Sequence, residues 1–210
     1  DRNYVVTTEP GTLTVTSAGK VSGKLVEHGS NWTFTATSYD ARSVTRGEER
    51  DYVVVANAKC GKAERPLELH VTGRTVEGVA ADAGLASGAF GDATLELWRN
   101  VWKDADAKAY LATIAGKYTY LLSDGEDAVA TQSGEDAVEL PLSLNASSGL
   151  ISGTAKIPWQ ANRNVTFSTT VIATSNGVEA VFYVAPYKSG VTSYSEFFER
   201  FAIPPPADDE

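Results

Sequence analysis

Hydrophobic residues alternate with polar ones along most of this 210-residue chain. β-Branched and aromatic residues in a period of two are typical of strands with one buried face. Clusters of Gly, Asp, Asn and Ser separate these segments at intervals of about ten residues, as in antiparallel hairpins. The sequence therefore predicts an all-β fold of antiparallel meanders. The predicted strands cover residues 4–10, 12–18, 31–39, 51–58, 67–73, 93–98, 117–124, 138–146, 150–157, 164–174 and 178–187.

Two segments break the alternation. Residues 104–116 are rich in Ala and stop at Gly116, so we predict a short helix or a connecting segment near 104–115. Residues 193–201 begin with a possible Ser N-cap and contain Phe197, Phe198 and Phe201, a pattern compatible with one or two helical turns. The Pro-rich, acidic residues 204–210 predict a linker or tail.

One hairpin pattern occurs twice. "LTVTSAGKVSGKL" (13–25) and "LSLNASSGLISGTAKI" (142–157) align without a gap over 17–23 and 147–153, and a strand containing Thr-Phe follows each. Gly19 and Gly149 can take the positive φ of a tight turn, whereas Gly23 and Gly153 permit a bulge or a close approach by a neighbouring backbone. Sheets that curl at such points favour a barrel-like or sandwich architecture. The alternative is chance recurrence in a chain rich in Thr, Ser and Gly.

The repeat predicts the domain organisation. We expect a first β module over 1–103, a connecting segment over 104–116, a related second module over 117–203 and the tail over 204–210. The halves form either two domains or one continuous sheet system.

Three stretches carry a resemblance to a known kind of module. "GKYTYLL" (116–122), "GLISGTAKI" (149–157) and "VFYVAPYKSG" (181–190) resemble a repeat in large exported surface proteins of Verrucomicrobia, Lentisphaerae and Planctomycetes. "GTLTVTSAGKVSGKL" and "GAFGDATLELW" resemble the unit that usually precedes it. The chain departs from the pattern at "SDGEDAVATQSGED", where the module has a shorter Gly-rich turn. The resemblance implies a non-catalytic, barrel-like repeat and supplies no active-site residues.

Composition narrows the possible partners. The net charge is −9 and the pI about 4.8, which argues against a nucleic-acid groove or binding to an anionic membrane surface. We find no run of about 18 apolar residues, so we expect no membrane span. Cys60 is the single cysteine and cannot form an intramolecular disulfide. The chain lacks Met and starts at Asp1, so we expect a processed protein or a piece of a longer one.

The sequence shows no catalytic signature. His28 and His70 are the only histidines, and no Gly-x-Ser-x-Gly motif, P-loop or dinucleotide fingerprint accompanies them. Nucleophilic hydrolysis needs a base beside a hydroxyl or thiol. We therefore predict that the chain is not an enzyme and needs no cofactor.

An acidic segment offers the one candidate metal site. Grouped carboxylates in a loop can bind Ca²⁺, which prefers six to eight oxygen ligands, although the spacing is not that of an EF-hand. The alternative is a solvated loop. A glycan-processing enzyme using these acids is the third functional hypothesis. The residues are Asp124, Glu126, Asp127, Glu135 and Asp136.

The segment "IPWQANRN" gives a candidate ligand site. An exposed Trp beside amides and a guanidinium suits sugar binding, because the ring stacks on the apolar face of a sugar and the polar groups read its hydroxyls. The candidates are Trp159, Gln160, Asn162 and Arg163, and a carbohydrate-binding module is the second functional hypothesis.

The leading hypothesis is a non-catalytic extracellular module, structural or adhesive, in a bacterial surface or secreted protein. Its expected partners are neighbouring domains of a larger surface protein, identical copies, or glycans. Asn-x-Ser/Thr sequons at Asn31, Asn145 and Asn164 matter if the host glycosylates.

Overall fold

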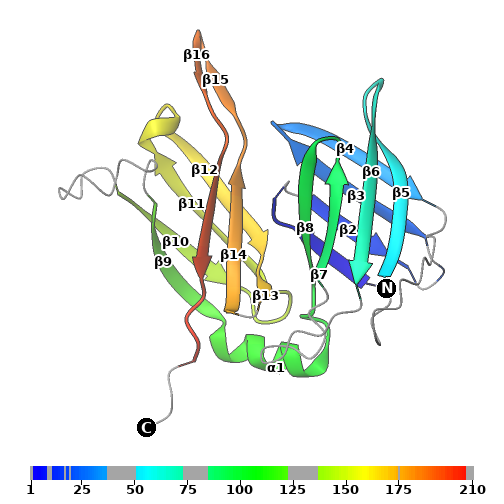
Figure 1. The fold of residues 1–210 in the computed structure, drawn as a ribbon. Helices are drawn as coiled ribbons and strands as arrows, with labels where there is room; N and C mark the ends of the chain where they lie inside the picture. Colours follow the sequence, from blue (N-terminus) through cyan, green and yellow to red (C-terminus); the bar gives the residue numbers. More distant parts are fainter. Residues whose placement is uncertain are drawn as a thin grey trace.

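The structure is a computed structural model that describes residues 2–8, 11–16, 18, 20–36, 51–72, 85–122, 137–174 and 176–206. The alternating segments form antiparallel strands, and the all-β prediction is confirmed. Two β bodies lie side by side, with helix α1 at their base (Figure 1).

The first body is a closed eight-stranded antiparallel barrel. Each strand pairs with the next, and β1 also pairs with β8, for example Val5 with Trp98. The strands are β1 (Arg2–Val6), β2 (Gly11–Val15), β3 (Val21–Glu27), β4 (Ser30–Ala36), β5 (Asp51–Cys60), β6 (Ala63–Thr72), β7 (Leu85–Phe90) and β8 (Ala93–Arg99).

Apolar side chains fill the interior of the barrel, as expected for eight strands. They come from alternate positions of the strands, and the ring of Trp32 packs edge-on against Phe90 at 5.3 Å between centroids. Cys60 is partly buried against this core. The largest members are Tyr4, Leu13, Leu25, Trp32, Phe34, Leu67, Leu69, Phe90, Leu95 and Leu97.

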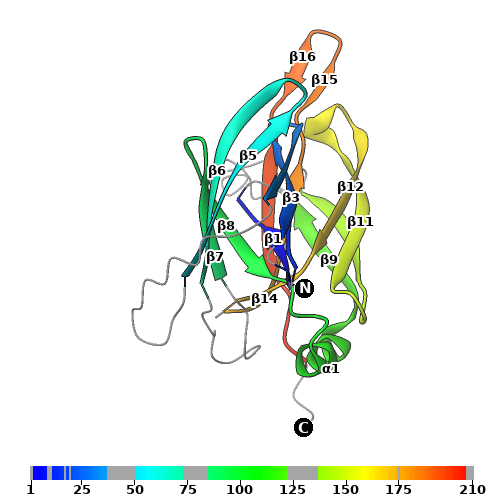
Figure 2. The ribbon, with the colours of Figure 1, turned by 90° about the vertical axis from the view of Figure 1, so that its right-hand side faces the viewer.

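The second body consists of two packed sheets and a projecting ribbon. One sheet has the order β12-β11-β10-β9, and the other the order β13-β14-β17. The β15–β16 ribbon extends beyond both bodies (Figures 1 and 2). The strands are β9 (Gly116–Leu122), β10 (Val138–Leu144), β11 (Leu150–Ile157), β12 (Arg163–Thr170), β13 (Ile172–Thr174), β14 (Gly177–Val184), β15 (Tyr187–Ser189), β16 (Thr192–Tyr194) and β17 (Phe197–Ala202).

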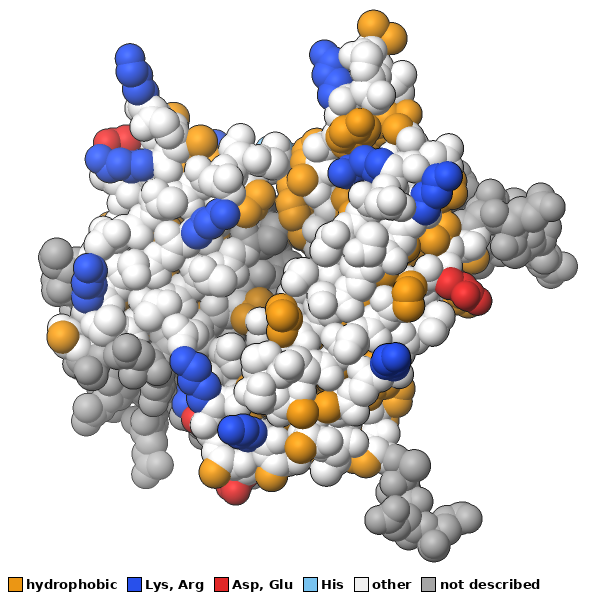
Figure 3. Space-filling view, turned by 180° about the vertical axis from the view of Figure 1, so that it is seen from behind, with side chains coloured by type: hydrophobic (Ala, Val, Ile, Leu, Met, Phe, Trp, Pro, Cys, Tyr) orange, Lys and Arg blue, Asp and Glu red, His pale blue; other side chains and the backbone are white. Residues whose placement is uncertain are grey.

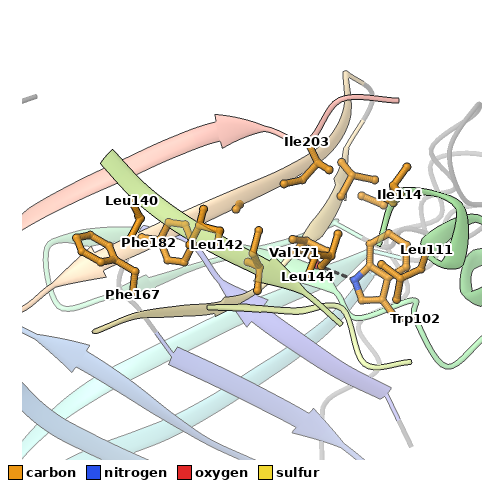
Figure 4. Packing of buried hydrophobic residues seen from close by; sticks show 14 of the residues in the cluster. Trp102, Leu111, Ile114, Leu140, Leu142, Leu144, Phe167, Val171, Phe182 and Ile203 are labelled. Carbon is orange, nitrogen blue, oxygen red and sulfur yellow. Dashed lines mark hydrogen bonds between the residues drawn. The ribbon is translucent and has the colours of Figure 1, made fainter. Parts of the chain in front are cut away.

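The helix α1 (Ala105–Ile114) confirms the predicted short helix. It buries Ala107, Leu111 and Ile114 in the core of the second body. Trp102, just before the helix, is 2% exposed, and its indole Nε1 donates a hydrogen bond to the carbonyl of Val171 at 2.7 Å (Figure 4). The helix and Trp102 therefore form one end of this core.

The helical turns considered for 193–201 are wrong, because strands β16 and β17 occupy this segment. Phe197 and Phe201 are partly buried against the core of the second body, whereas Phe198 between them is 43% exposed. Burial therefore alternates with the period of two that is typical of a strand. The register is defined by six residue pairs with β14, from Val184↔Phe197 to Glu179↔Ala202. Pairing with β14 therefore outweighs the local preference for a helix.

The repeated pattern lies at matching places in the two bodies. Its copies form the β2–β3 and β10–β11 hairpins, and the following Thr-Phe segments form β4 and β12. In each body, four residues lie side by side across four adjacent strands, and their types are Tyr, Leu, Gly and Phe in that order. These Tyr–Leu–Gly–Phe rows are Tyr4, Leu13, Gly23 and Phe34 in the barrel, and Tyr118, Leu142, Gly153 and Phe167 in the second body.

The glycines of these rows allow the close approach that the sequence predicted. A β carbon on Gly23 would lie 2.3 Å from the carbonyl oxygen of Thr12, and one on Gly153 would lie 1.9 Å from that of Pro141. Gly149 has the expected positive φ, 70°, in its turn, whereas Gly19 lies outside the described residues. That the halves are two related domains stays a prediction.

Candidate functional site

The candidate Trp159 site lies in the turn between β11 and β12. Pro158 opens a single 3₁₀ turn, Pro158–Gln160, because its fixed φ suits the first helical position. Ala161 and Asn162 then take positive φ values of 59° and 54°, which return the chain into β12. Asn162 is exposed.

Two of the predicted ligand residues serve as internal contacts. Gln160 is 2% exposed, and its Nε2 donates to the carbonyl of Ser195 at 2.9 Å. Arg163 Nη2 donates to Gln160 Oε1 at 3.1 Å, and its guanidinium lies 4.4 Å from the ring centroid of Tyr187. Both side chains thus tie the β11–β12 turn to the β15–β16 ribbon.

Aromatic side chains gather at the base of this ribbon. Trp159 is partly buried, with its ring centroid 6.4 Å from that of Phe197. Tyr187 and Tyr194, on β15 and β16, are stacked with centroids 6.1 Å apart. Figure 3 shows hydrophobic side chains concentrated over this end of the second body. We call Trp159, Tyr187, Tyr194 and Phe197 the aromatic group.

The two tyrosines of the aromatic group were not predicted from the sequence. Both lie in "YKSGVTSY", where a Gly-centred turn at Gly190 brings the two ends together, with Tyr187 paired to Tyr194. That hairpin signal could have found them, but Tyr187 was placed at the end of a predicted strand and Tyr194 in the possible helical turns of 193–201.

The acidic segment cannot be placed. Asp124, Glu126, Asp127, Glu135 and Asp136 all lie outside the described residues, so the Ca²⁺ hypothesis and the glycan-processing hypothesis stay predictions. Within the part of the chain that the structure describes, no group of three or more His, Cys, Asp or Glu side chains is arranged to hold a metal ion.

The histidines contact carboxylates. His70 Nε2 lies 2.6 Å from Glu68 Oε1 on the outside of β6, and His28 Nδ1 lies 2.8 Å from Glu196 Oε1. Neither of them has a hydroxyl or thiol partner among the residues that the structure describes.

His28 belongs to a polar contact between the two bodies. Glu196 also accepts a hydrogen bond from the hydroxyl of Tyr183, 2.6 Å from its Oε2. That hydroxyl in turn accepts from the backbone N–H of Gly29 at 3.1 Å. The β3–β4 turn of the barrel is thereby joined to β14 and to the residue before β17.

Shifted ionisable groups lie between β9 and β17. Burial raises the pKa of the Glu199 carboxyl, and the hydrogen bond from the Tyr120 hydroxyl, 3.4 Å away, partly opposes this. Burial, and then the Glu199 charge, raise the pKa of Tyr120, whose ring stacks on Phe201 at 4.4 Å. These groups join the two sheets of the second body.

Two of the three sequons have exposed, extended asparagines, Asn31 in β4 and Asn164 in β12. Asn145 instead accepts hydrogen bonds from the backbone N–H groups of Ser147 and Ser148, at 2.9 and 3.2 Å, and shapes the β10–β11 turn.

Comparison with family models, curated proteins and solved structures finds no match to this chain. Among the described residues, α1 is the single α-helix and is too short to cross a bilayer.

Proposed function

We propose that this chain is a non-catalytic extracellular β module of a bacterial surface or secreted protein, serving as a structural spacer or an adhesion unit. The supporting observation is that both bodies use their large apolar side chains for filled interiors, built on the same Tyr–Leu–Gly–Phe row. A β unit with a well-packed interior that is repeated along a chain can hold other domains at a fixed distance from one another. This role needs no reactive cavity.

The resemblance to exported proteins of Verrucomicrobia, Lentisphaerae and Planctomycetes supports this proposal. Its opening stretch, "GKYTYLL", coincides with β9, and "VFYVAPYKSG" runs from β14 through β15. Neighbouring domains of the same surface protein, or identical copies, are the partners we propose.

Surface accessibility tests this function. An antibody raised against the purified chain should label intact cells of the source organism, and protease added to intact cells should remove the epitope. An epitope that is protected until the cells are lysed would contradict the extracellular location. Turnover of glycoside, ester or peptide substrates by the purified chain would contradict the non-catalytic role.

The aromatic group favours a second candidate function, carbohydrate binding. It brings Trp159 and two tyrosines together on one partly exposed surface, and rings of this kind stack on sugars. Affinity electrophoresis in glycan-containing gels should show retardation that Trp159→Ala abolishes. Tyr110→Ala, on α1 and outside the aromatic group, is the aromatic control and should leave retardation unchanged. Retardation that survives in Trp159→Ala would rule out this site.

A further inference from the structure

A groove of about 390 Å³ lies between the two bodies. It opens on the face shown in Figure 3, where the surface is hollowed between the barrel and the second body. Its volume lies within the range of about 300–1,000 Å³ that is common for small-ligand sites.

The barrel wall of the groove is a row of outward-facing side chains. Val5 pairs with Thr12, and Thr12 with Lys24, so these three lie side by side across β1, β2 and β3. They face outward because the residues between them along the strands, such as Tyr4 and Leu13, fill the barrel. This wall therefore offers an apolar group, a hydroxyl and an ammonium group in order.

The opposite wall combines aromatic and hydroxyl side chains. Tyr183 of β14 pairs with Phe198 of β17, and their ring centroids are 5.1 Å apart. Phe198 and Leu150 are each 43% exposed, which is unusual for large apolar side chains in this structure. Ser168 and Thr170 of β12 add hydroxyls to this wall.

Polar contacts hold the two walls at a fixed separation. Glu196 bonds to His28 and to the Tyr183 hydroxyl, which receives the Gly29 N–H. Arg200 bonds to Glu179 of its own sheet at 2.6 Å and approaches Glu96 of the barrel at 4.0 Å. A groove already held open binds a ligand without the cost of ordering its walls.

The chemistry of the walls identifies a ligand class. An exposed ring suits the apolar face of a sugar, and short hydroxyl side chains suit its hydroxyl groups. Lys24 is exposed and has no ion-pair partner among the residues that the structure describes, so it is free to meet an anion. We propose that this groove binds an acidic oligosaccharide, with a sugar ring against Phe198 and a uronate carboxylate beside Lys24.

This inference goes beyond the proposed module function, and it uses a surface separate from the aromatic group. Binding is measured on the purified chain, so this test can fail or succeed independently of the test of the extracellular location. The probe is a trimer of galacturonic acid, titrated into the full chain by calorimetry. The comparison probes are a neutral cello-oligosaccharide of the same length and a triglutamate peptide.

We expect the galacturonate trimer to bind more tightly than either comparison probe. Lys24→Gln and Phe198→Ser should each weaken its binding by about tenfold or more, because one removes the charge partner and the other the ring. Lys20→Gln removes an exposed lysine that does not line the groove and should leave binding unchanged. Circular dichroism of each variant establishes that it is folded.

Several outcomes would overturn the proposal. One is that the galacturonate trimer does not bind. Another is that the neutral probe or the peptide binds as tightly as the trimer. A third is that Lys20→Gln weakens binding of the trimer as much as Lys24→Gln does. Loss of binding in Trp159→Ala with retention in Phe198→Ser would also overturn it, since the sugar would then lie on the aromatic group.

Discussion

Replacing Gly153 with alanine tests the close approach of β10 and β11. The new β carbon would lie 1.9 Å from the carbonyl oxygen of Pro141 and 3.0 Å from its carbonyl carbon, whereas ordinary contact begins at 3.4 Å. The obstacle is backbone, so no side-chain rotation relieves the overlap. The two strands would have to move apart by more than 1 Å beside the pairs Ser143↔Ser152 and Leu144↔Ile151.

Forcing extra carbon into a well-packed site costs about 1–3 kcal/mol, and a clash with backbone belongs at the upper end of that range. We therefore expect Gly153→Ala to lower the free energy of unfolding by about 3 kcal/mol. For a chain of this size, that corresponds to a fall in melting temperature of about 6–12 °C. Gly23→Ala should cost a similar amount, because its β carbon would lie 2.3 Å from the carbonyl oxygen of Thr12.

Urea denaturation followed by circular dichroism measures these losses. Gly61→Ala is the control, since Gly61 has a φ of 59° and no atom within 4 Å of its β-carbon position. It should cost only the roughly 1–2 kcal/mol of a left-handed alanine. If Gly153→Ala were as stable as the parent chain, or lost no more than Gly61→Ala, the reasoning from strand proximity would be refuted.

Three further predictions follow from buried or charged groups. Glu199→Gln should raise the urea midpoint at pH 7, because burial raises the pKa of this carboxyl and disfavours its charged form. The gain should shrink as pH falls from that raised pKa to 4.5, the value of the unshifted group, and should be absent at lower pH. Trp102→Phe should lower the free energy of unfolding by about 1–3 kcal/mol, since the Val171 carbonyl loses its buried donor. Adding Ca²⁺ should leave the melting temperature unchanged if the acidic segment 123–136 is a solvated loop.

Each of these predictions has a contradicting result. A pH-independent difference between Glu199→Gln and the parent chain would show that burial of charge is not the cause. A Trp102→Phe variant of parental stability would show that the indole hydrogen bond adds nothing net. A rise in melting temperature with Ca²⁺ that EDTA reverses would establish a metal site.

The sequence predicted most of the fold because the information was local. Alternation specified most of the strands, although β7 and the β15–β16 ribbon were not predicted. Ala-rich composition favoured a short helix or a connecting segment where α1 lies, and the glycines of the repeat indicated where strands come close. The segment with Phe197, Phe198 and Phe201 was misread because three rings within five residues fit both a helical and an extended pattern. Six pairs with β14, which lies outside this motif on the other side of the β15–β16 ribbon in the chain, decide between the two.

The candidate site was predicted less well, for the same reason. The motif around Trp159 was found, but the buried Gln160 bonds to Ser195, and the partly buried Arg163 contacts Gln160 and Tyr187. Tyr187 lies on β15 and Ser195 directly follows β16, so the local motif could not predict either contact. The groove was not predicted at all, since its walls belong to opposite halves of the chain.

The pairing of β1 with β8 has a consequence for synthesis. While the ribosome is still making residues 5–98, Val5 lacks its second neighbour, Trp98, and the sheet cannot close. At ordinary translation rates of about 5–20 residues per second, the nascent chain exposes an unfinished apolar sheet for about 5–20 s. Most hairpins form in a much shorter time than this interval. A chaperone that binds the nascent chain would therefore act mainly on the incomplete sheet during this interval.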